Sequence, residues 1–238
     1  KNMKSKLILK SCTSNFFLSI YLYVRYVWFT KFNRKKINRK ELKSIYLGII
    51  KKNLMIKNDW FTRNIPNLDY LFQKDKLYNK TINALEIGSY EGNSSFFFLK
   101  YFKNLKLTCV DTFEGSDEHD GKDFDTVFEN FKLNTSSFTD RIKVYKESSD
   151  NFFSKKDKEM YDLIYIDGSH YSDDVLKDAN NSFKYLNKNG YIIFDDFLWN
   201  YYSKINDNPI GAIKIFFKNN FFNLKIASIG YQIIFKKI

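Results

Sequence analysis

The sequence predicts an α/β protein built on a seven-stranded, mostly parallel sheet with helices on both faces. From residue 84 onward, apolar stretches of strand length alternate with stretches of helical periodicity, a pattern that favours a parallel sheet with right-handed crossovers. The first of these strands runs into a glycine-containing turn that leads directly into a helix. Carboxylates follow several strands, at the edge where an open α/β sheet gathers its ligand-binding residues.

The alternating part predicts five strands and four helices. We expect the strands at 84–89, 105–112, 141–146, 161–167 and 190–195, and the helices at 92–102, 125–134, 149–156 and 172–186. The helix at 172–186 has the clearest signal, because Ser172 can cap it and Asp173 and Asp174 favour its N-terminal dipole. A further helix at 209–219 precedes two short strands, 223–229 and 231–237, which a tight turn at Gly230 joins into an antiparallel hairpin.

Charge divides the chain into two predicted parts. The 238 residues carry a net charge of +12. Residues 1–63 hold 16 basic and two acidic residues, which gives +14, so the remaining 23 basic and 25 acidic residues give −2. We therefore expect a basic, aromatic-rich helical extension over 1–63 and a nearly neutral domain over 64–238, with Pro66 close to their boundary.

The extension contains a short apolar run, Phe16 to Val24, which Arg25 interrupts. The run is too short to cross a membrane, and no small-residue cleavage site of a secretory signal follows it. It fits either an amphipathic helix in a membrane interface or a helix that packs on the domain or on a partner subunit. The basic cluster over 31–43 is read as a solvated helix face, with a phosphate-binding patch as the alternative.

Cysteine content argues against a secreted, disulfide-linked fold. The chain has two cysteines, Cys12 and Cys109, and Cys109 lies inside a predicted core strand. This usage fits a reducing compartment. We expect a cytoplasmic protein, peripheral to a membrane only if the basic extension binds one.

The turn after the first strand predicts a nucleoside site without a pyrophosphate. Glu86 to Gly92 has neither the Gly-x-Gly-x-x-Gly pattern of dinucleotide folds nor the Gly-Lys-Ser/Thr of a P-loop. An adenosine ligand that lacks phosphates suits this loop better. The candidate residues are Glu86, Gly88, Ser89, Tyr90, Gly92, Ser94, Ser95, Asp111, Thr112 and Ser148.

Two of these candidates have specific expected contacts. Asp111 stands 25 residues after Glu86 at the tip of the next strand, where a carboxylate can accept hydrogen bonds from both ribose hydroxyls; capping of the following turn is the alternative. Ser148, just past the third strand, can meet the adenine edge or cap the next helix. The acidic loop from Gly115 to Gly121, with His119, is read as a solvated loop, with a lid as the alternative.

Carboxylates at the ends of the fourth and fifth strands predict a reacting site. Asp167 ends one strand, and Asp195 and Asp196 end the other. Three acids around one point suit Mg²⁺, Mn²⁺ or Ca²⁺ better than zinc, whereas strand-end aspartates can also cap turns. His170 follows Asp167 by three residues, so it can act as a general base or can orient Asp167 or the substrate.

These segments resemble the class I S-adenosylmethionine-dependent methyltransferases, which have a Rossmann-like fold. The resemblance is carried by Glu86–Gly92, by Val110 to Gly115 and by Tyr165 to His170, and it covers about 80–238. Within this family, the segments most resemble those of the metal-dependent sugar, macrolide and catechol-type O-methyltransferases. The common Gly-x-Gly-x-Gly form is absent, which leaves the loop contacts open.

The resemblance implies the roles of the candidate residues. Glu86, Gly88 and Gly92 would hold the amino-acid end of S-adenosylmethionine, and Asp111 its ribose. Asp167, Asp195 and Asp196 would bind a divalent cation such as Mg²⁺ or Mn²⁺.

The expected reaction is O-methylation of a small hydroxylated acceptor such as a sugar. A nucleic-acid methyltransferase and a non-catalytic cofactor-binding scaffold are the alternatives. The chain lacks the Asn/Asp-Pro-Pro-Tyr/Phe motif with which nucleic-acid methyltransferases bind a flipped base, so nucleic acid is not an expected partner. A homo-oligomer is compatible with the sequence.

Overall fold

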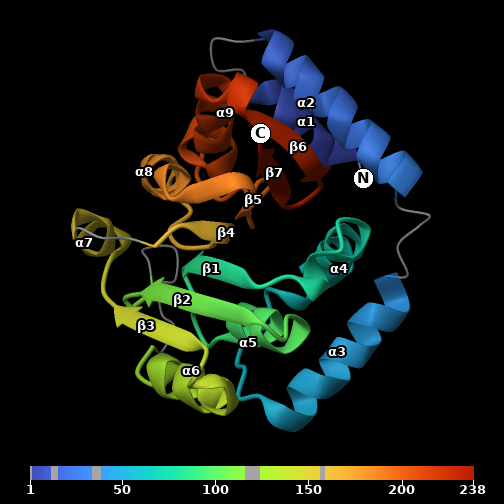
Figure 1. Ribbon diagram of the computed structural model, residues 1–238. Helices are drawn as coiled ribbons and strands as arrows, with labels where there is room; N and C mark the ends of the chain where they lie inside the picture. The colour runs from blue at the N-terminus through green and yellow to red at the C-terminus, as the bar shows by residue number, and fades with distance from the viewer. Residues whose placement is uncertain (1, 12–15, 34–38, 116–123, 156–158) are drawn as a thin grey trace. The chain divides into compact units, whose positions relative to one another are not determined.

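The computed structural model describes residues 2–11, 16–33, 39–115, 124–155 and 159–238 (Figure 1). Contacts within the chain group it into two compact units. One unit comprises residues 38–161, and the other combines residues 1–37 with residues 162–238.

The unit of residues 38–161 holds three parallel strands and the helices around them. Its elements are α3 (Arg39–Asn53), η3 (Thr62–Asn64), α4 (Ile65–Lys74), η4 (Leu77–Asn79), β1 (Ile82–Ile87), α5 (Asn93–Tyr101), β2 (Leu105–Asp111), α6 (Val127–Thr135), η6 (Ser136–Phe138), β3 (Ile142–Lys146) and α7 (Ser149–Ser154). Strand β2 pairs with β1 and with β3 in parallel, so that Cys109 lies opposite Glu86 on one side and Val144 on the other.

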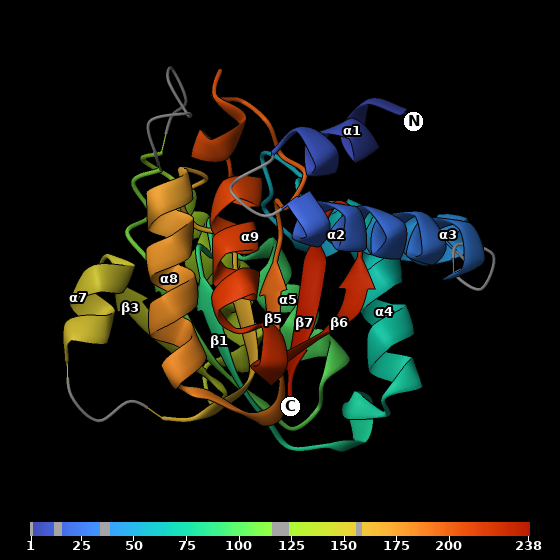
Figure 2. The same ribbon diagram turned by 90° about the horizontal axis from the view of Figure 1, so that it is seen from above.

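The second unit holds the N-terminal helices and the C-terminal strands. Its elements are α1 (Asn2–Lys10), α2 (Phe16–Trp28), the π-helical turn η1 (Phe29–Asn33), β4 (Tyr161–Ile166), α8 (Ser172–Lys184), β5 (Leu186–Phe194), η7 (Ile205–Asp207), α9 (Pro209–Asn219), η8 (Phe221–Asn223), β6 (Leu224–Ile229) and β7 (Ile233–Lys237). Helices α8 and α9 lie side by side and α8 packs on β5 (Figure 2).

The strands form one seven-stranded sheet in the order β3-β2-β1-β4-β5-β7-β6. Strand β7 pairs antiparallel with β5 and with β6, which confirms the predicted C-terminal hairpin. The predicted fold class, a mostly parallel sheet with an antiparallel end, is therefore confirmed. The observed strand ends lie within a few residues of the predicted ones, except that β5 begins four residues earlier, at Leu186.

Aromatic side chains fill the interior of both units. In the first unit, Phe98 of α5 packs against Phe72 of α4 with ring centroids 6.5 Å apart, and both rings are buried. In the second, Phe216 of α9 packs against Phe194 of β5 at 5.5 Å and against Phe235 of β7 at 6.4 Å. Ring pairs of this kind stabilise a fold beyond the free energy gained from burying their apolar area. The phenylalanine-rich composition thus supplies the core.

The N-terminal part of the chain is helical, as predicted. The apolar run Phe16 to Val24 lies in α2, which continues past Arg25 to Trp28. Among the described residues, none of the helices combines the length and the apolar character needed to cross a membrane. Pro66 stands in the first turn of α4, where its fixed φ is favourable; the division of the chain at residue 63 stays a prediction.

Candidate active site

The turn between β1 and α5 has a backbone that requires glycine. Gly88 has a φ of +82° and Gly92 a φ of +80°, and Tyr90 between them has a φ of +48°. Gly92 is the N-cap residue of α5, and a Cβ atom at this position would lie 3.0 Å from Cδ2 of Phe131. The amide of Gly88 donates to the carbonyl of Val110 at 3.0 Å, which ties the turn to β2. The backbone conformation thus favours glycine at both positions, and the nearby Phe131 ring adds a limit on space at Gly92.

Glu86 supports this turn from inside the protein. Its side chain is fully buried, and Oε2 accepts hydrogen bonds from the Ser89 hydroxyl at 2.8 Å and from the Ser95 hydroxyl. The Cys109 thiol donates to the same oxygen at 3.3 Å. Burial raises the pKa of Glu86, although bonds from Ser94, Ser95, Ser89 and Cys109 oppose the shift. Among the described residues, Oε1 has no hydrogen-bond partner.

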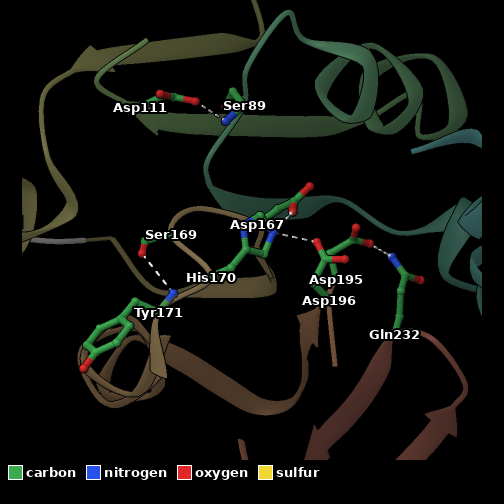
Figure 3. A network of polar contacts seen from close by, with 9 residues as sticks. All are labelled: Ser89, Asp111, Asp167, Ser169, His170, Tyr171, Asp195, Asp196 and Gln232. Carbon is green, nitrogen blue, oxygen red and sulfur yellow. Dashed lines mark hydrogen bonds and ion pairs between the residues drawn. The ribbon is translucent and has the colours of Figure 1, made fainter. Parts of the chain in front are cut away.

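Asp111 holds the turn from the end of β2. Its Oδ2 accepts from the amide of Ser89 at 2.6 Å (Figure 3) and from the amide of Tyr90 at 2.8 Å. Its Oδ1 accepts from the amide of Phe113 at 2.6 Å. An ionised carboxylate has about four acceptor sites, so these three bonds leave capacity for one ribose hydroxyl. The predicted ribose contact of Asp111 stays a prediction.

The remaining predicted cofactor residues differ in burial and in hydrogen bonding. Ser94 and Ser95 lie buried in the first turn of α5, on the Glu86 side. The Thr112 hydroxyl accepts from the amide of Glu114 at 3.3 Å. Ser148 caps α7 by accepting from the amide of Asn151 at 3.2 Å, which is the capping role that the sequence left open for it. The acidic loop with His119 lies outside the described residues, which stop at 115 and resume at 124.

Glu91 was not predicted, and the structure shows it to be a central anchor of the turn. It is buried, its Oε2 accepts from the amide of Lys57 at 2.7 Å and its Oε1 accepts from Asn130 Nδ2 at 2.8 Å. Asn134 Nδ2 donates to the Glu91 carbonyl at 2.7 Å. These partners lie 34 to 43 residues away along the chain, so no local pattern could have shown the contacts; the signal available was an acid inside the glycine turn.

The second predicted group, in residues 162–238, forms an acidic cluster after β4 and β5. Nε2 of His170 lies 2.8 Å from Oδ2 of Asp196 and 4.0 Å from Oδ1 of Asp167 (Figure 3). The three side chains can place one ligand atom each within 4.8 Å of one another, and all are partly buried. Of the three acids that were expected to converge, Asp167 and Asp196 lie together here, beside His170. We name these three residues the acidic cluster.

Asp195 does not join the acidic cluster. Strand β5 ends at Phe194, and the carboxylates of Asp195 and Asp196 point in different directions (Figure 3). Asp195 is 2% exposed, and its Oδ1 accepts a hydrogen bond from Gln232 Nε2. Burial, together with Asp195 and the two acids of the cluster, raises the pKa of the Tyr165 phenol well above its ordinary value. Asp195 is thus part of a buried polar group next to the cluster.

Aromatic rings line one side of the acidic cluster. The Trp199 ring stacks on His170 with centroids 4.6 Å apart and an interplanar angle of 23°. The Tyr201 ring stacks on Trp199 with centroids 5.4 Å apart, and it is largely exposed. Tyr202 contacts both Trp199 and Tyr171 edge to face. We name Trp199, Tyr201, Tyr202 and Tyr171 the aromatic wall; sequence analysis missed it because its members come from two separate segments.

The donor set of the acidic cluster fits a hard divalent cation. Asp167 and Asp196 offer carboxylate oxygens, which Mg²⁺ and Mn²⁺ prefer. Mg²⁺ is commonly bound by only one or two carboxylates, with water and substrate as its other ligands. Since His170 Nε2 is within hydrogen-bond distance of Asp196, the imidazole can also orient that carboxylate without binding the ion itself.

Part of the chain is similar to known protein families and proteins. Residues 85–197 match the model of a family described as a methyltransferase domain. An uncharacterized protein of Acanthamoeba polyphaga mimivirus is 31% identical over 141 residues, which are 56% of this chain and 57% of that protein. The chain thus spans a little over half the length of this curated relative.

Solved structures share the fold at low sequence identity. The O-methyltransferase from Bacillus cereus in complex with SAH has a TM-score of 0.54 and 15% identity, over 93% of this chain and 100% of that one. The MycE methyltransferase from the mycinamycin biosynthetic pathway, in complex with Mg and SAH, has a TM-score of 0.57 and 16% identity, over 84% and 54%. Residues 85–197 are therefore similar to a methyltransferase domain family, and the chain shares its fold with these solved methyltransferases.

Proposed function

We propose that the protein transfers a methyl group from S-adenosylmethionine to a hydroxyl of a small acceptor, with a divalent cation at Asp167 and Asp196. The observation that carries the proposal is the convergence of the acidic cluster, where two carboxylates and one imidazole place their ligand atoms within 4.8 Å. A methyltransferase domain that methylates a hydroxyl needs a means to position the acceptor and remove its proton. The acidic cluster supplies groups for both tasks.

The turn after β1 would hold the donor. Gly88 and Gly92 allow close approach of a ligand to the backbone, and Asp111 has acceptor capacity left for the ribose. Glu86 is too deeply buried to reach the ligand as the structure stands, so its contribution would be to hold Ser89 and Ser95 in place. S-adenosylmethionine supplies an electrophilic methyl group on its sulfonium.

His170 is the proposed general base. When its Nε2 carries the proton and donates to Asp196, the neutral imidazole keeps Nδ1 as its acceptor nitrogen. Asp196 fixes the ring through this bond, and stacking on Trp199 fixes its plane. The ring would then accept the hydroxyl proton of an acceptor as its oxygen bonds to the methyl carbon and the carbon–sulfur bond of the donor breaks, which leaves a neutral thioether. A cation at Asp167 and Asp196 would lower the pKa of a bound hydroxyl.

A sugar-like ring is the proposed class of acceptor. The aromatic wall offers flat apolar faces next to the acidic cluster, and the exposed Tyr201 ring extends them toward solvent. A pocket for a small ligand commonly combines such faces with a few convergent polar groups. The MycE structures include one in complex with Mg, SAH and mycinamycin VI, so a protein of this fold can hold all three together; for the present chain the acceptor is part of the proposal.

Calorimetry on the full chain tests the proposal. We expect S-adenosylmethionine to bind and Mn²⁺ to bind separately, with Mn²⁺ binding lost in Asp167→Asn and kept in Asp173→Asn, a matched control at an exposed position in α8. Transfer of labelled methyl groups to a panel of sugars should follow the same pattern. Cofactor binding without transfer to any hydroxylated acceptor would favour the scaffold alternative.

A further inference from the structure

Helix α2 is apolar on nearly every side, which is unusual for a helix at a protein surface. Its 13 residues contain one charged side chain, Arg25. Leu18 and Leu22 are buried on its inner side. On the opposite side Phe16, Ile20, Val24 and Trp28 follow one another at four-residue spacing, and Phe32 of η1 continues the series. All five are exposed, and we name them the outer row.

Contacts with the C-terminal strands and α9 fix which side of α2 faces outward. Helix α2 lies beside α9 and β6 (Figure 1). Tyr21 stacks on Phe217 of α9 with centroids 6.3 Å apart, and Arg25 Nη2 donates to the Ile226 carbonyl of β6 at 3.4 Å. Lys214 of α9 is 1% exposed and donates to the Ser19 hydroxyl at 2.6 Å. With its inner side held in this way, the outer row is left facing away from the strands.

The apolar surface extends beyond α2. Phe221 of η8 contacts Tyr21 edge to face with centroids 6.0 Å apart. Its neighbour Phe222 is 91% exposed. A group of large, exposed aromatic side chains on one surface is typical of an interaction site.

The positive charge of the N-terminal segment that contains the outer row favours an anionic partner. Residues 1–37 contain nine basic residues and no acidic residue. Of these, Lys6, Lys10 and Lys31 are described and exposed. A second copy of the chain docked on the same surface would bring a second acid-free, basic segment against the first, which charge repulsion opposes. An anionic surface complements this charge, and aromatic rings beside lysines are typical of helices in the lipid headgroup region.

We propose that the outer row of α2 docks the protein in the interface of an anionic lipid bilayer. A helix of 13 residues is about 20 Å long, which suits a position in the plane of the interface. Phe16, Ile20 and Val24 would enter the acyl boundary while Lys10 and Lys31 remain among the headgroups. The outer row shares no residue with the acidic cluster, so the proposal stands independently of the acceptor.

Vesicle binding by the full chain tests the proposal. We expect sedimentation with vesicles of equal parts phosphatidylserine and phosphatidylcholine, and much weaker sedimentation with phosphatidylcholine alone or in high salt. Val24→Glu should lower the affinity for the anionic vesicles roughly tenfold or more. Leu133→Glu places the same charge on an exposed apolar position of α6 and should bind as the wild type does.

The outcomes separate the bilayer from other occupants. Equal binding of Val24→Glu and Leu133→Glu, with both variants folded by circular dichroism, would overturn the proposal. So would a wild-type dimer that Val24→Glu converts to a monomer in light scattering, without vesicle binding by either. Because Val24 is exposed, its substitution should leave the fold intact, and Ile20→Ser gives a second, uncharged variant that should also lose binding.

Discussion

At the scale of single residues, Asp195 and Asp196 show how two neighbouring acids take different tasks. Asp196 faces His170, whereas Asp195 is buried against Gln232. Asp196→Asn should therefore lower kcat about 100-fold or more, as expected for the loss of a group that orients a general base, with little change in stability. Asp195→Asn should instead lower the free energy of unfolding by about 1–2 kcal/mol. Steady-state kinetics and urea unfolding of both variants check this division; equal effects on kcat and stability would contradict it.

The burial of Glu86 predicts a pH dependence of stability. Burial raises its pKa above the unfolded value of about 4.3. A proton held more tightly in the folded state stabilises the protein fully below the unfolded pKa, and this contribution is lost as the pH rises through the folded pKa. Glu86→Gln keeps an acceptor oxygen for Ser89 and Ser95 and has no charge to desolvate.

We therefore expect the stability of Glu86→Gln relative to the wild type to increase as the pH rises above about 4. Urea unfolding over a pH series measures this difference. A difference that is independent of pH would mean that the buried carboxyl titrates alike in the folded and unfolded states. Binding of S-adenosylmethionine by the variant would show in addition that the serines keep their places.

At the scale of elements, the turn between β1 and α5 depends on Gly92. Gly92→Ala forces a side chain into a left-handed conformation and brings its Cβ to 3.0 Å from Phe131. We expect the variant to lose about 1–2 kcal/mol of stability and to bind S-adenosylmethionine more weakly, because the turn must shift. Gly48 of α3 is the matched control, since a Cβ atom added there would have nothing within 4 Å of it.

Gly48→Ala should stabilise the protein by about 0.5–1 kcal/mol, because alanine favours a helix interior. Thermal unfolding and calorimetry of the two glycine variants give both readouts. A Gly92→Ala protein with wild-type stability and affinity would show that the left-handed turn has room to adapt.

The sequence predicted most elements because their signals are local. The helix expected at 172–186 ends at Lys184, and the hairpin expected at 223–229 and 231–237 is β6 and β7. Helix α1 lies within the helical extension expected over 1–63, but the burial of its Ile8 depends on tertiary contacts that sequence periodicity in a lysine-rich stretch does not show. In the candidate site, position after a strand predicted where Asp167 and His170 lie, but the stack on Trp199 depends on tertiary packing.

At the scale of the whole molecule, the N-terminal helices group with the C-terminal half of the chain. The bond from Arg25 to Ile226 joins residues 201 positions apart, and those of Lys214 to Ile8 and Ser19 join residues about as distant. Such contacts hold α1 and α2 against α9 and β6 without any continuous sequence signal. The predicted extension over 1–63 therefore contains residues that depend on the rest of the chain for their place.

Lys214 is the residue whose loss should release these helices. Its ammonium is buried and donates to the Ile8 carbonyl at 3.1 Å, the Ser11 hydroxyl at 3.0 Å and the Ser19 hydroxyl at 2.6 Å. Lys214→Ala removes a charged donor from several acceptors at once and leaves them buried, so we expect a loss of about 3 kcal/mol in the free energy of unfolding. Limited trypsin digestion should then cleave near Lys10 or Arg25 before it cleaves elsewhere.

The matched control is Lys218→Ala, one turn further along α9 at an exposed position. It removes the same side chain without leaving any buried acceptor unpaired. The Lys218→Ala protein should therefore retain wild-type stability and resistance to trypsin. If Lys214→Ala behaves as Lys218→Ala does, then apolar packing alone, including the stack of Tyr21 on Phe217, holds the helices. If Lys214→Ala does release the helices, anionic vesicles should protect Arg25 from trypsin in the wild type but not in the variant. The reason is that the residues of the outer row face the bilayer together only while α2 is held against α9 and β6.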